Sequence, residues 1–201
     1  MSTEVRKGIG CDGKTLKQML DESDRLTKET GFYHGLKELP LTKGNPLGME
    51  VFSTRLVAGL QSALETTRMI AASPIMREVA EICCGLYTPE GHCIAQSTGM
   101  SAHVPVMGQI IDWMIKQNYE EEVGINEGDL FCCNENVIAV FHAADVADIA
   151  PVFYKGELVA WAGTTCMEAE IGAIAPGTLP GANTERFTDG MRIYAEKIGT
   201  N

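Results

Sequence analysis

The amino-acid sequence predicts an α+β fold, a mixed and largely antiparallel sheet with two main amphipathic helices packed on it. Two observations predict the helices, because apolar residues recur at three- and four-residue spacing over 52–70 and again over 106–115. A third predicts the sheet, since short apolar segments follow one another around tight turns at 88–91 and 155–156. With 201 residues, 45% of them apolar, the chain is long enough to bury a core.

The first 50 residues are expected to form an N-terminal arm. A short amphipathic helix is predicted over Lys14–Glu29, because its apolar residues stand among charges and Gly31 can cap its end in the left-handed conformation. An extended linker over Leu36–Gly48, with two prolines, should follow. We expect residues 51–201 to form one α/β domain.

Two longer helices are predicted inside this domain. The first ends before Pro74, because the residue that precedes a proline leaves the helical region. The second has Asn118 near its end. The positions that define the first are Phe52, Leu56, Leu60, Ala63, Leu64, Thr67 and Ile70, and those that define the second are Val106, Met107, Ile110, Ile111, Met114 and Ile115.

The remaining apolar segments are predicted to be strands. Four of them form two hairpins, closed by the turns at 88–91 and 155–156. Glycines and prolines over 172–181 predict a loop that holds its shape through contacts with something else. The predicted strands are Glu81–Tyr87, His92–Gln96, Asp129–Asn134, Val137–Phe141, Val146–Tyr154 and Glu157–Thr165.

The composition narrows the range of partners. The formal net charge is -11, so a phosphate backbone or an anionic membrane surface would repel the chain on average. Residues 1–8 are polar and lack the apolar core of a secretory signal, and no window approaches the roughly 20 apolar residues that a membrane span needs. We expect a cytoplasmic protein that binds neither nucleic acid nor a membrane.

The seven cysteines are expected to be reduced. Their number is odd, and two pairs are adjacent, Cys83 with Cys84 and Cys132 with Cys133. Neighbours in a strand point to opposite faces, so each pair is typical of small buried apolar residues and not of disulfides. Because no two cysteines have C-x-x-C spacing, a structural zinc finger is not indicated.

A phosphate-binding motif is matched letter by letter near the N-terminus. Residues Gly8–Thr15 satisfy G-x-x-x-x-G-K-[ST]. Such a loop binds phosphate when a buried strand delivers its glycines to a helix N-terminus, whereas here a few mostly polar residues precede it. The alternatives are a nucleotide site and, in better agreement with this context, a glycine turn that leads from a flexible arm into a helix.

A histidine and an aspartate stand three residues apart between two predicted strands. An imidazole and a carboxylate at this spacing in a turn can face one ion, and nitrogen and oxygen donors suit zinc, manganese or iron. His142 and Asp145 are therefore a candidate metal pair, with a hydrogen-bonded surface pair as the alternative. His103, just before the second long helix, is either a residue of the helix start or a pocket residue.

A series of short motifs follows one order along the whole chain: 15–17 (TLK), 31–33 (GFY), 35–37 (GLK), 71–75 (AASPI), 86–91 (LYTPEG), 95–96 (AQ), His103 with Met107, 128–134 (GDLFCCN), His142 with Asp145, 151–153 (PVF), 156–158 (GEL), Trp161 and 176–177 (PG). This order resembles that of the hydantoinase B/oxoprolinase family. Within the family the arm is most similar to alpha subunits of acetone carboxylase, with acetophenone carboxylase a near relative. Family members continue for several hundred residues beyond position 201, which implies a fragment or one part of a split subunit.

The resemblance implies an ATP-dependent ketone carboxylase that works as a complex. In such a complex a hydantoinase A-type beta subunit binds ATP and Mg, a small gamma subunit is present, and the alpha-type subunit holds a metal site. Acetone or an aryl ketone is joined to bicarbonate, by way of carboxyphosphate and a phosphorylated enol, to give a 3-oxoacid. Residues 51–201 would be a hydantoinase B-like domain that contributes the carboxylation site, with ATP bound on another chain.

The same resemblance implies a metal held by two histidines and an aspartate. His142 and Asp145 match the H-x-x-D half of that set. The place of the second histidine falls on Met167, whose thioether is a poor ligand for manganese or zinc. Glu170 is the first substitute, because it matches a family aspartate, and after it come Glu168 and Cys166.

A ligand set of His142, Asp145 and Glu170 is hard and anionic, which favours manganese over zinc or iron. The metal would polarise a carboxylate or enolate oxygen and hold the reactants in register. By its position in the family pattern, His103 is implied as a nearby catalytic general base.

Two other functions stay open beside the carboxylase. The first is hydrolysis of a cyclic amide, a hydantoin or 5-oxoproline, by the related ATP-coupled enzymes. The second is a non-catalytic scaffold subunit, because the loss of the second histidine at Met167 is compatible with a chain that only completes an interface.

Overall fold

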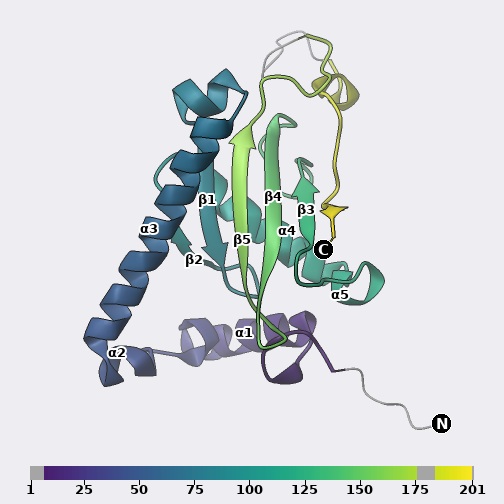
Figure 1. Ribbon diagram of the computed structural model, residues 1–201. Helices are drawn as coiled ribbons and strands as arrows, with labels where there is room; N and C mark the ends of the chain where they lie inside the picture. The colour runs from purple at the N-terminus through teal and green to yellow at the C-terminus, as the bar shows by residue number, and fades with distance from the viewer. Residues whose placement is uncertain (1–6, 176–183, 201) are drawn as a thin grey trace, which may run out of the picture.

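The chain is built around one six-stranded sheet. A computed structural model describes residues 7–175 and 184–200, and Figure 1 shows the strands with helices in front of and behind them. The strands are β1 (Ile82–Tyr87), β2 (Cys93–Gln96), β3 (Leu130–Cys133), β4 (Asp145–Tyr154), β5 (Glu157–Met167) and β6 (Glu196–Gly199). Their order is β2-β1-β5-β4-β3-β6, and each of these pairs is antiparallel. The predicted α+β class with a largely antiparallel sheet is confirmed.

Two helices, α3 (Pro46–Ile70) and α4 (Val104–Lys116), pack on opposite faces of this sheet. In β1, Cys83 and Tyr87 belong to the cluster that contains α4, whereas Ile82 and Cys84 pack with Leu64 of α3. Alternate residues of a strand face opposite ways, so the two helices cover different faces. Figure 1 accordingly places α4 behind the strands and α3 in front, beside β1 and β2. The other helices are α1 (Leu16–Thr30), α2 (Pro40–Gly44) and α5 (Tyr119–Glu122).

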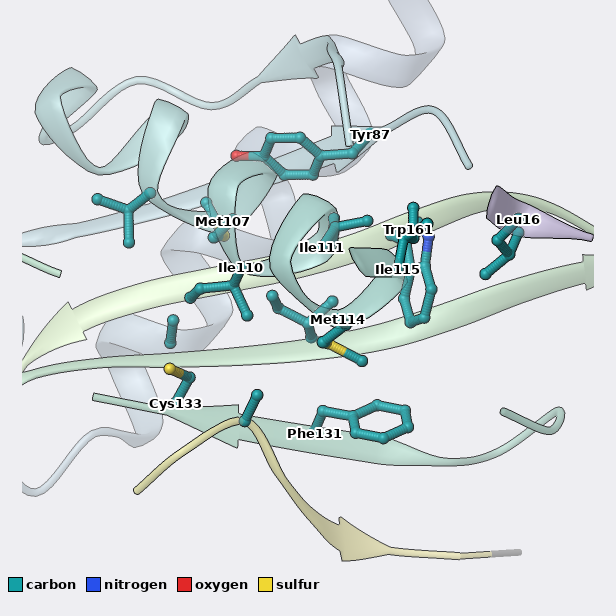
Figure 2. Close-up of a cluster of buried hydrophobic side chains, with 14 of the residues drawn as sticks. Leu16, Tyr87, Met107, Ile110, Ile111, Met114, Ile115, Phe131, Cys133 and Trp161 are labelled. Atoms are coloured by element: carbon teal, nitrogen blue, oxygen red, sulfur yellow. The ribbon is translucent and has the colours of Figure 1, made fainter. Parts of the chain in front are cut away.

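The main core lies between α4 and the sheet (Figure 2). Pro105 stands in the first turn of α4, where its missing N–H removes no bond within the helix. The hydroxyl of Tyr87 donates to the carbonyl of Val104 (2.8 Å), which ties the start of α4 to β1. Figure 2 shows the side chains of α4 beside the ring of Trp161 and above that of Phe131. The buried face of α4 consists of Val104, Val106, Met107, Ile110, Ile111, Met114 and Ile115.

The predicted short helix of the N-terminal arm is confirmed as α1. It begins with a reciprocal capping box, in which Thr15 Oγ1 accepts from the backbone of Gln18 (3.2 Å) and Gln18 Oε1 accepts from the backbone of Thr15 (2.9 Å). It ends at Gly31, whose φ of 76° is one that glycine adopts without steric cost. Leu16 and Leu20 are buried, so the arm packs against the same core as α4.

The predicted extended linker is wrong. The segment Leu36–Gly48 contains all of α2 and the first residues of α3. Pro40 and Pro46 each stand in the first turn of a helix, where proline is favoured, and Asn45 Oδ1 accepts from the backbone of Gly48 (2.9 Å). The two prolines therefore start helices and do not mark an extended chain.

The predicted strand Val137–Phe141 is also wrong. The backbone nitrogens of Ile138 and Ala139 both donate to the carbonyl of Glu135 (3.0 and 3.1 Å), and the segment forms successive turns. The carboxylate of Glu135 accepts from the backbone of Val137 (2.9 Å). Apolar residues suggested a strand, but these local bonds satisfy the backbone within the turn.

Strand β6 has no counterpart among the predicted strands, because it is short and half exposed. Two ion pairs hold this C-terminal part against the sheet. Lys197 Nζ lies 2.9 Å from Asp129 Oδ2, and Arg186 pairs with the fully buried Glu135. Of the loop predicted over 172–181, the first residues have no helix or strand, and 176–181, with the Pro-Gly motif, lie outside the described residues.

All seven cysteines are free, as predicted, and both adjacent pairs are buried. Within each pair, in β1 and in β3, the two cysteines point to opposite faces of the strand as small buried residues. Across the described part of the chain, every helix is too short or too polar to pass through a bilayer.

Candidate metal centre

Three of the four predicted site residues meet where β4 begins. Asp145 is the first residue of β4, and its backbone N–H donates to the carbonyl of His142 (3.0 Å) in the turn that precedes the strand. His103 ends the short helix Ser101–His103, which runs directly into α4. The turn before β4 and the buried start of α4 therefore bring two imidazoles to one carboxylate.

Both histidines approach the same oxygen atom. The Nε2 atom of His142 lies 3.6 Å, and that of His103 3.9 Å, from Oδ1 of Asp145. The side chains of Asp145 and His103 are 1% and 2% exposed, and that of His142 is 19% exposed. A hydrogen-bonded surface pair does not describe this geometry, because the carboxylate is buried and both separations exceed hydrogen-bond length.

Burial lowers the pKa of His103, because an imidazolium removed from water is unfavourable. The negative charges of Asp145 and Glu81 oppose this shift, and the nearby His142 adds to it. His103 is therefore favoured in its neutral form, in which one ring nitrogen carries a lone pair. Neutral imidazole is the form that binds a metal ion or acts as a general base.

Several polar atoms at this point are buried without a hydrogen-bond partner. They are both ring nitrogens of His103, Nδ1 of His142 and both carboxylate oxygens of Asp145. Leaving such an atom unpaired costs about 1–3 kcal/mol, so their concentration at one point calls for a ligand. Imidazole and carboxylate donors fit zinc, manganese or iron. In the segments that the structure describes, no three His, Cys, Asp or Glu side chains already stand at ligand spacing, so binding requires the donors to close in.

Glu170, the other predicted ligand, lies outside this group. Its Oε1 accepts hydrogen bonds from the backbone nitrogens of Gly172 (2.6 Å) and Ala173 (2.9 Å) in the loop after β5. Met167 is the direct partner of Asp145 in the pairing of β4 with β5. The place implied for a second histidine is thus beside the carboxylate, and it holds a thioether.

A side chain of the same protein binds one amide of the Gly8–Thr15 motif and the amide of the residue that follows it. The backbone nitrogens of Ile9 and Leu16 donate to Oε1 and Oε2 of Glu120 in α5 (3.0 and 2.7 Å), and the motif's lysine pairs with Glu22 (2.5 Å). A helix start that holds a carboxylate in this way favours the glycine turn over the nucleotide site. No local sequence pattern points to Glu120, because it lies more than a hundred positions from both amides.

Comparison with known proteins supplies the family. The sequence profile described as hydantoinase B/oxoprolinase matches residues 45–201. The chain belongs to the hydantoinase B/oxoprolinase family. This confirms the resemblance carried by the short motifs, and the matched segment contains His103, His142 and Asp145.

Proteins similar to this chain include subunits of two ketone carboxylases and a 5-oxoprolinase. The acetone carboxylase alpha subunit of Xanthobacter autotrophicus is 39% identical over 195 residues, which are 97% of this chain and 25% of that subunit. The acetophenone carboxylase delta subunit of Aromatoleum aromaticum is 34% identical over 116 residues (58% of this chain, 16% of that subunit). The 5-oxoprolinase 1 of Arabidopsis thaliana is 27% identical over 150 residues (75% and 12%).

A solved structure agrees with the sequence comparison. The nucleotide-free structure of acetone carboxylase matches with a TM-score of 0.94 and 39% identity, and the match covers 97% of this chain and 26% of that chain. The protein therefore has the fold of that part of acetone carboxylase. It spans about a quarter of the length of the acetone carboxylase alpha subunit.

Proposed function

We propose that this protein is an alpha-type subunit, or a segment of one, of an ATP-dependent ketone carboxylase. The complex would join acetone or an aryl ketone to bicarbonate and release a 3-oxoacid. The observation that carries the proposal is the likeness to acetone carboxylase over 97% of this chain, in sequence and in fold. The similarity to an acetophenone carboxylase subunit supports a carbonyl substrate of this class.

The contribution of this chain would be a carboxylation site at the start of β4, with a divalent metal, manganese before zinc or iron, on His142 and Asp145. When bound, the metal supplies a Lewis acid that polarises a carboxylate or enolate oxygen. The buried carboxylate of Asp145 holds a cation more strongly than an exposed one, because little water screens the charge. His103, whose pKa is lowered by burial, lies beside Asp145 and would act as the general base that the resemblance implies.

ATP and Mg would bind on a hydantoinase A-type beta subunit, with a small gamma subunit completing the complex. Two features of this chain support that division. Glu120 binds the amides of Ile9 and Leu16, so these two amides are not available to a phosphate. Large apolar side chains on α2 and α3 are exposed, as at surfaces that contact other proteins: Leu41, Leu47, Val51, Phe52 and Val57.

The test is incorporation of labelled bicarbonate into acetone or acetophenone by the purified complex that contains this chain. We expect a labelled 3-oxoacid whose formation requires ATP and the ketone together. Omission of either should abolish the product. A complex that consumes no ATP and fixes no bicarbonate with any ketone contradicts the proposal.

A cyclic-amide hydrolase of the hydantoinase or 5-oxoprolinase type is the second candidate. The observation that favours it is the 27% identity to a 5-oxoprolinase over 75% of this chain. The same complex, supplied with ATP and either 5-oxoproline or a hydantoin, would then release the ring-opened product and fix no bicarbonate.

A non-catalytic scaffold is the third candidate, and Met167 is the observation that favours it. Metal analysis of the purified complex separates it from the two enzymes. A stoichiometric transition metal that is lost on His142→Ala contradicts a scaffold, and a complex without such a metal supports one.

A further inference from the structure

The position implied for a second histidine ligand of the proposed metal centre holds a methionine, which has no nitrogen donor in its side chain. Met167 lies opposite Asp145, and directly opposed residues in an antiparallel pair have their β-carbons about 4.5–5.5 Å apart. A residue at this position can thus share an ion with Asp145, but a thioether binds manganese, iron and zinc poorly. His142 and Asp145 are only two ligands, so the proposed site needs a third protein donor.

His103 is a donor that the fold delivers to this point. Two atoms bound to one ion at about 2.1 Å lie about 3.0–3.4 Å apart. The separations of 3.6 and 3.9 Å from Asp145 Oδ1 to the two Nε2 atoms exceed this by less than about 1 Å. The side chains must therefore rotate toward one another for all three to bind one ion.

The surroundings of His103 leave its ring free to bind. Neither ring nitrogen has a hydrogen-bond partner among the described residues, and the ring packs at 6.0 Å between centroids against Phe141. A histidine placed in a core for structural reasons usually satisfies at least one ring nitrogen. The carboxylate oxygens of Asp145 lack partners as well, so one cation between them would satisfy both residues.

We infer that His103 takes the place of the histidine missing at position 167, so that His103, His142 and Asp145 form a site of two histidines and one carboxylate. This rests on the proposed function, which supplies the metal, and it makes His103 a ligand in place of a general base. The ion would join the start of α4 to the start of β4. With one carboxylate in place of the two of a set that includes Glu170, the site is less anionic, and zinc and iron compete better with manganese.

The experiment counts the imidazoles bound to Mn²⁺. The purified complex is stripped of metal and reloaded with Mn²⁺, and the nitrogen hyperfine couplings are measured by pulsed electron paramagnetic resonance. We expect couplings from two imidazoles in the wild type and from one in His103→Gln, with the Kd for Mn²⁺ raised at least about tenfold. His92→Gln, at an exposed histidine outside the site, is the matched control and should change neither quantity.

A second variant keeps the test decisive if His103→Gln disturbs the core. Met167→His alone should show three imidazoles if His103 is a ligand, but only two if it is not. In the double variant Met167→His with His103→Gln, the second imidazole and the affinity for Mn²⁺ should return. Two imidazoles in Met167→His, or an unchanged spectrum in His103→Gln, overturn the inference and leave His103 as a base.

Failure of the metal centre itself has a different signature. In that case Mn²⁺ in the wild-type complex shows no nitrogen hyperfine couplings from the protein, or all of these couplings persist after His142→Ala. Either result rejects the metal-binding part of the proposed function, and the inference about His103 with it. Loss of Mn²⁺ on His142→Ala with no change on His103→Gln rejects the inference alone.

Discussion

The two helices that pack on the sheet differ in how much of their surface the chain covers. Helix α4 has 13 residues and buries seven of them, whereas α3 has 25 residues and, in the described structure, buries Leu64 alone. Both show apolar residues at helical spacing. Helical periodicity therefore predicts an apolar face but not which surface packs against it. The apolar face of α4 packs against this chain's own sheet, whereas most of the apolar side chains of α3 do not.

The largest effect should come from shortening a side chain of α4. Ile110 is fully buried between the helix and the sheet, so Ile110→Ala should lower the free energy of unfolding by about 2–5 kcal/mol. Urea unfolding followed by circular dichroism measures this. Val57→Ala, half exposed on α3, is the control, and an equal loss from both variants would break the comparison.

A smaller loss should follow when the contact that fixes the start of α4 is removed. The hydroxyl of Tyr87 donates to the carbonyl of Val104, and both groups are buried. Tyr87→Phe leaves that carbonyl unpaired and should cost about 1–3 kcal/mol in the same measurement. If stability does not change, α4 is held by apolar packing alone.

The polar contact that fastens α3 should contribute less. Gln61 Oε1 accepts from the backbone nitrogen (3.1 Å) and the hydroxyl (2.7 Å) of Thr98, at an exposed position. Gln61→Ala should therefore lower the free energy of unfolding by about 0.5–1.5 kcal/mol. Gln109→Ala, exposed on α4, is its counterpart and should stay within about 0.5 kcal/mol of the wild type.

The smallest effect is expected on the outer face of α3. Phe52 is 52% exposed, so Phe52→Ser should change the free energy of unfolding of this chain by less than about 0.5 kcal/mol. The same variant should weaken assembly of the proposed complex, measured by size-exclusion chromatography of the mixed subunits. A large loss of stability with unchanged assembly would mean that the chain itself covers this face.

Elements with a strong local signal could be predicted from the sequence. Both long helices and both hairpins carry enough apolar residues at one period to outweigh alternatives. Two of the failures came where polar contacts decide the backbone. The carboxylate of Glu135 turns Val137–Phe141 away from a strand, and β6 is held by Lys197 and its neighbours and not by an apolar pattern.

The candidate site divides in the same way. His142 and Asp145 could be paired from the sequence, because a turn brings residues three apart together. The approach of His103 to Asp145 depends on how α4 lies against β4, which no spacing reveals. Glu170 satisfied the family pattern, yet two backbone amides of its own loop bind its carboxylate.

Glu120 of α5 competes with dissolved anions for two backbone amides of the N-terminal arm. A carboxylate tethered to the same chain faces the amides of Ile9 and Leu16 at an effective concentration set by the fold and not by the solution. A dissolved phosphate would have to displace the carboxylate of Glu120. This displacement would also break the hydrogen bonds that hold the arm against α5. The segment that matches a nucleotide loop is thus bound to α5 of its own chain, and we expect Glu120→Ala to loosen the arm while leaving the sheet intact.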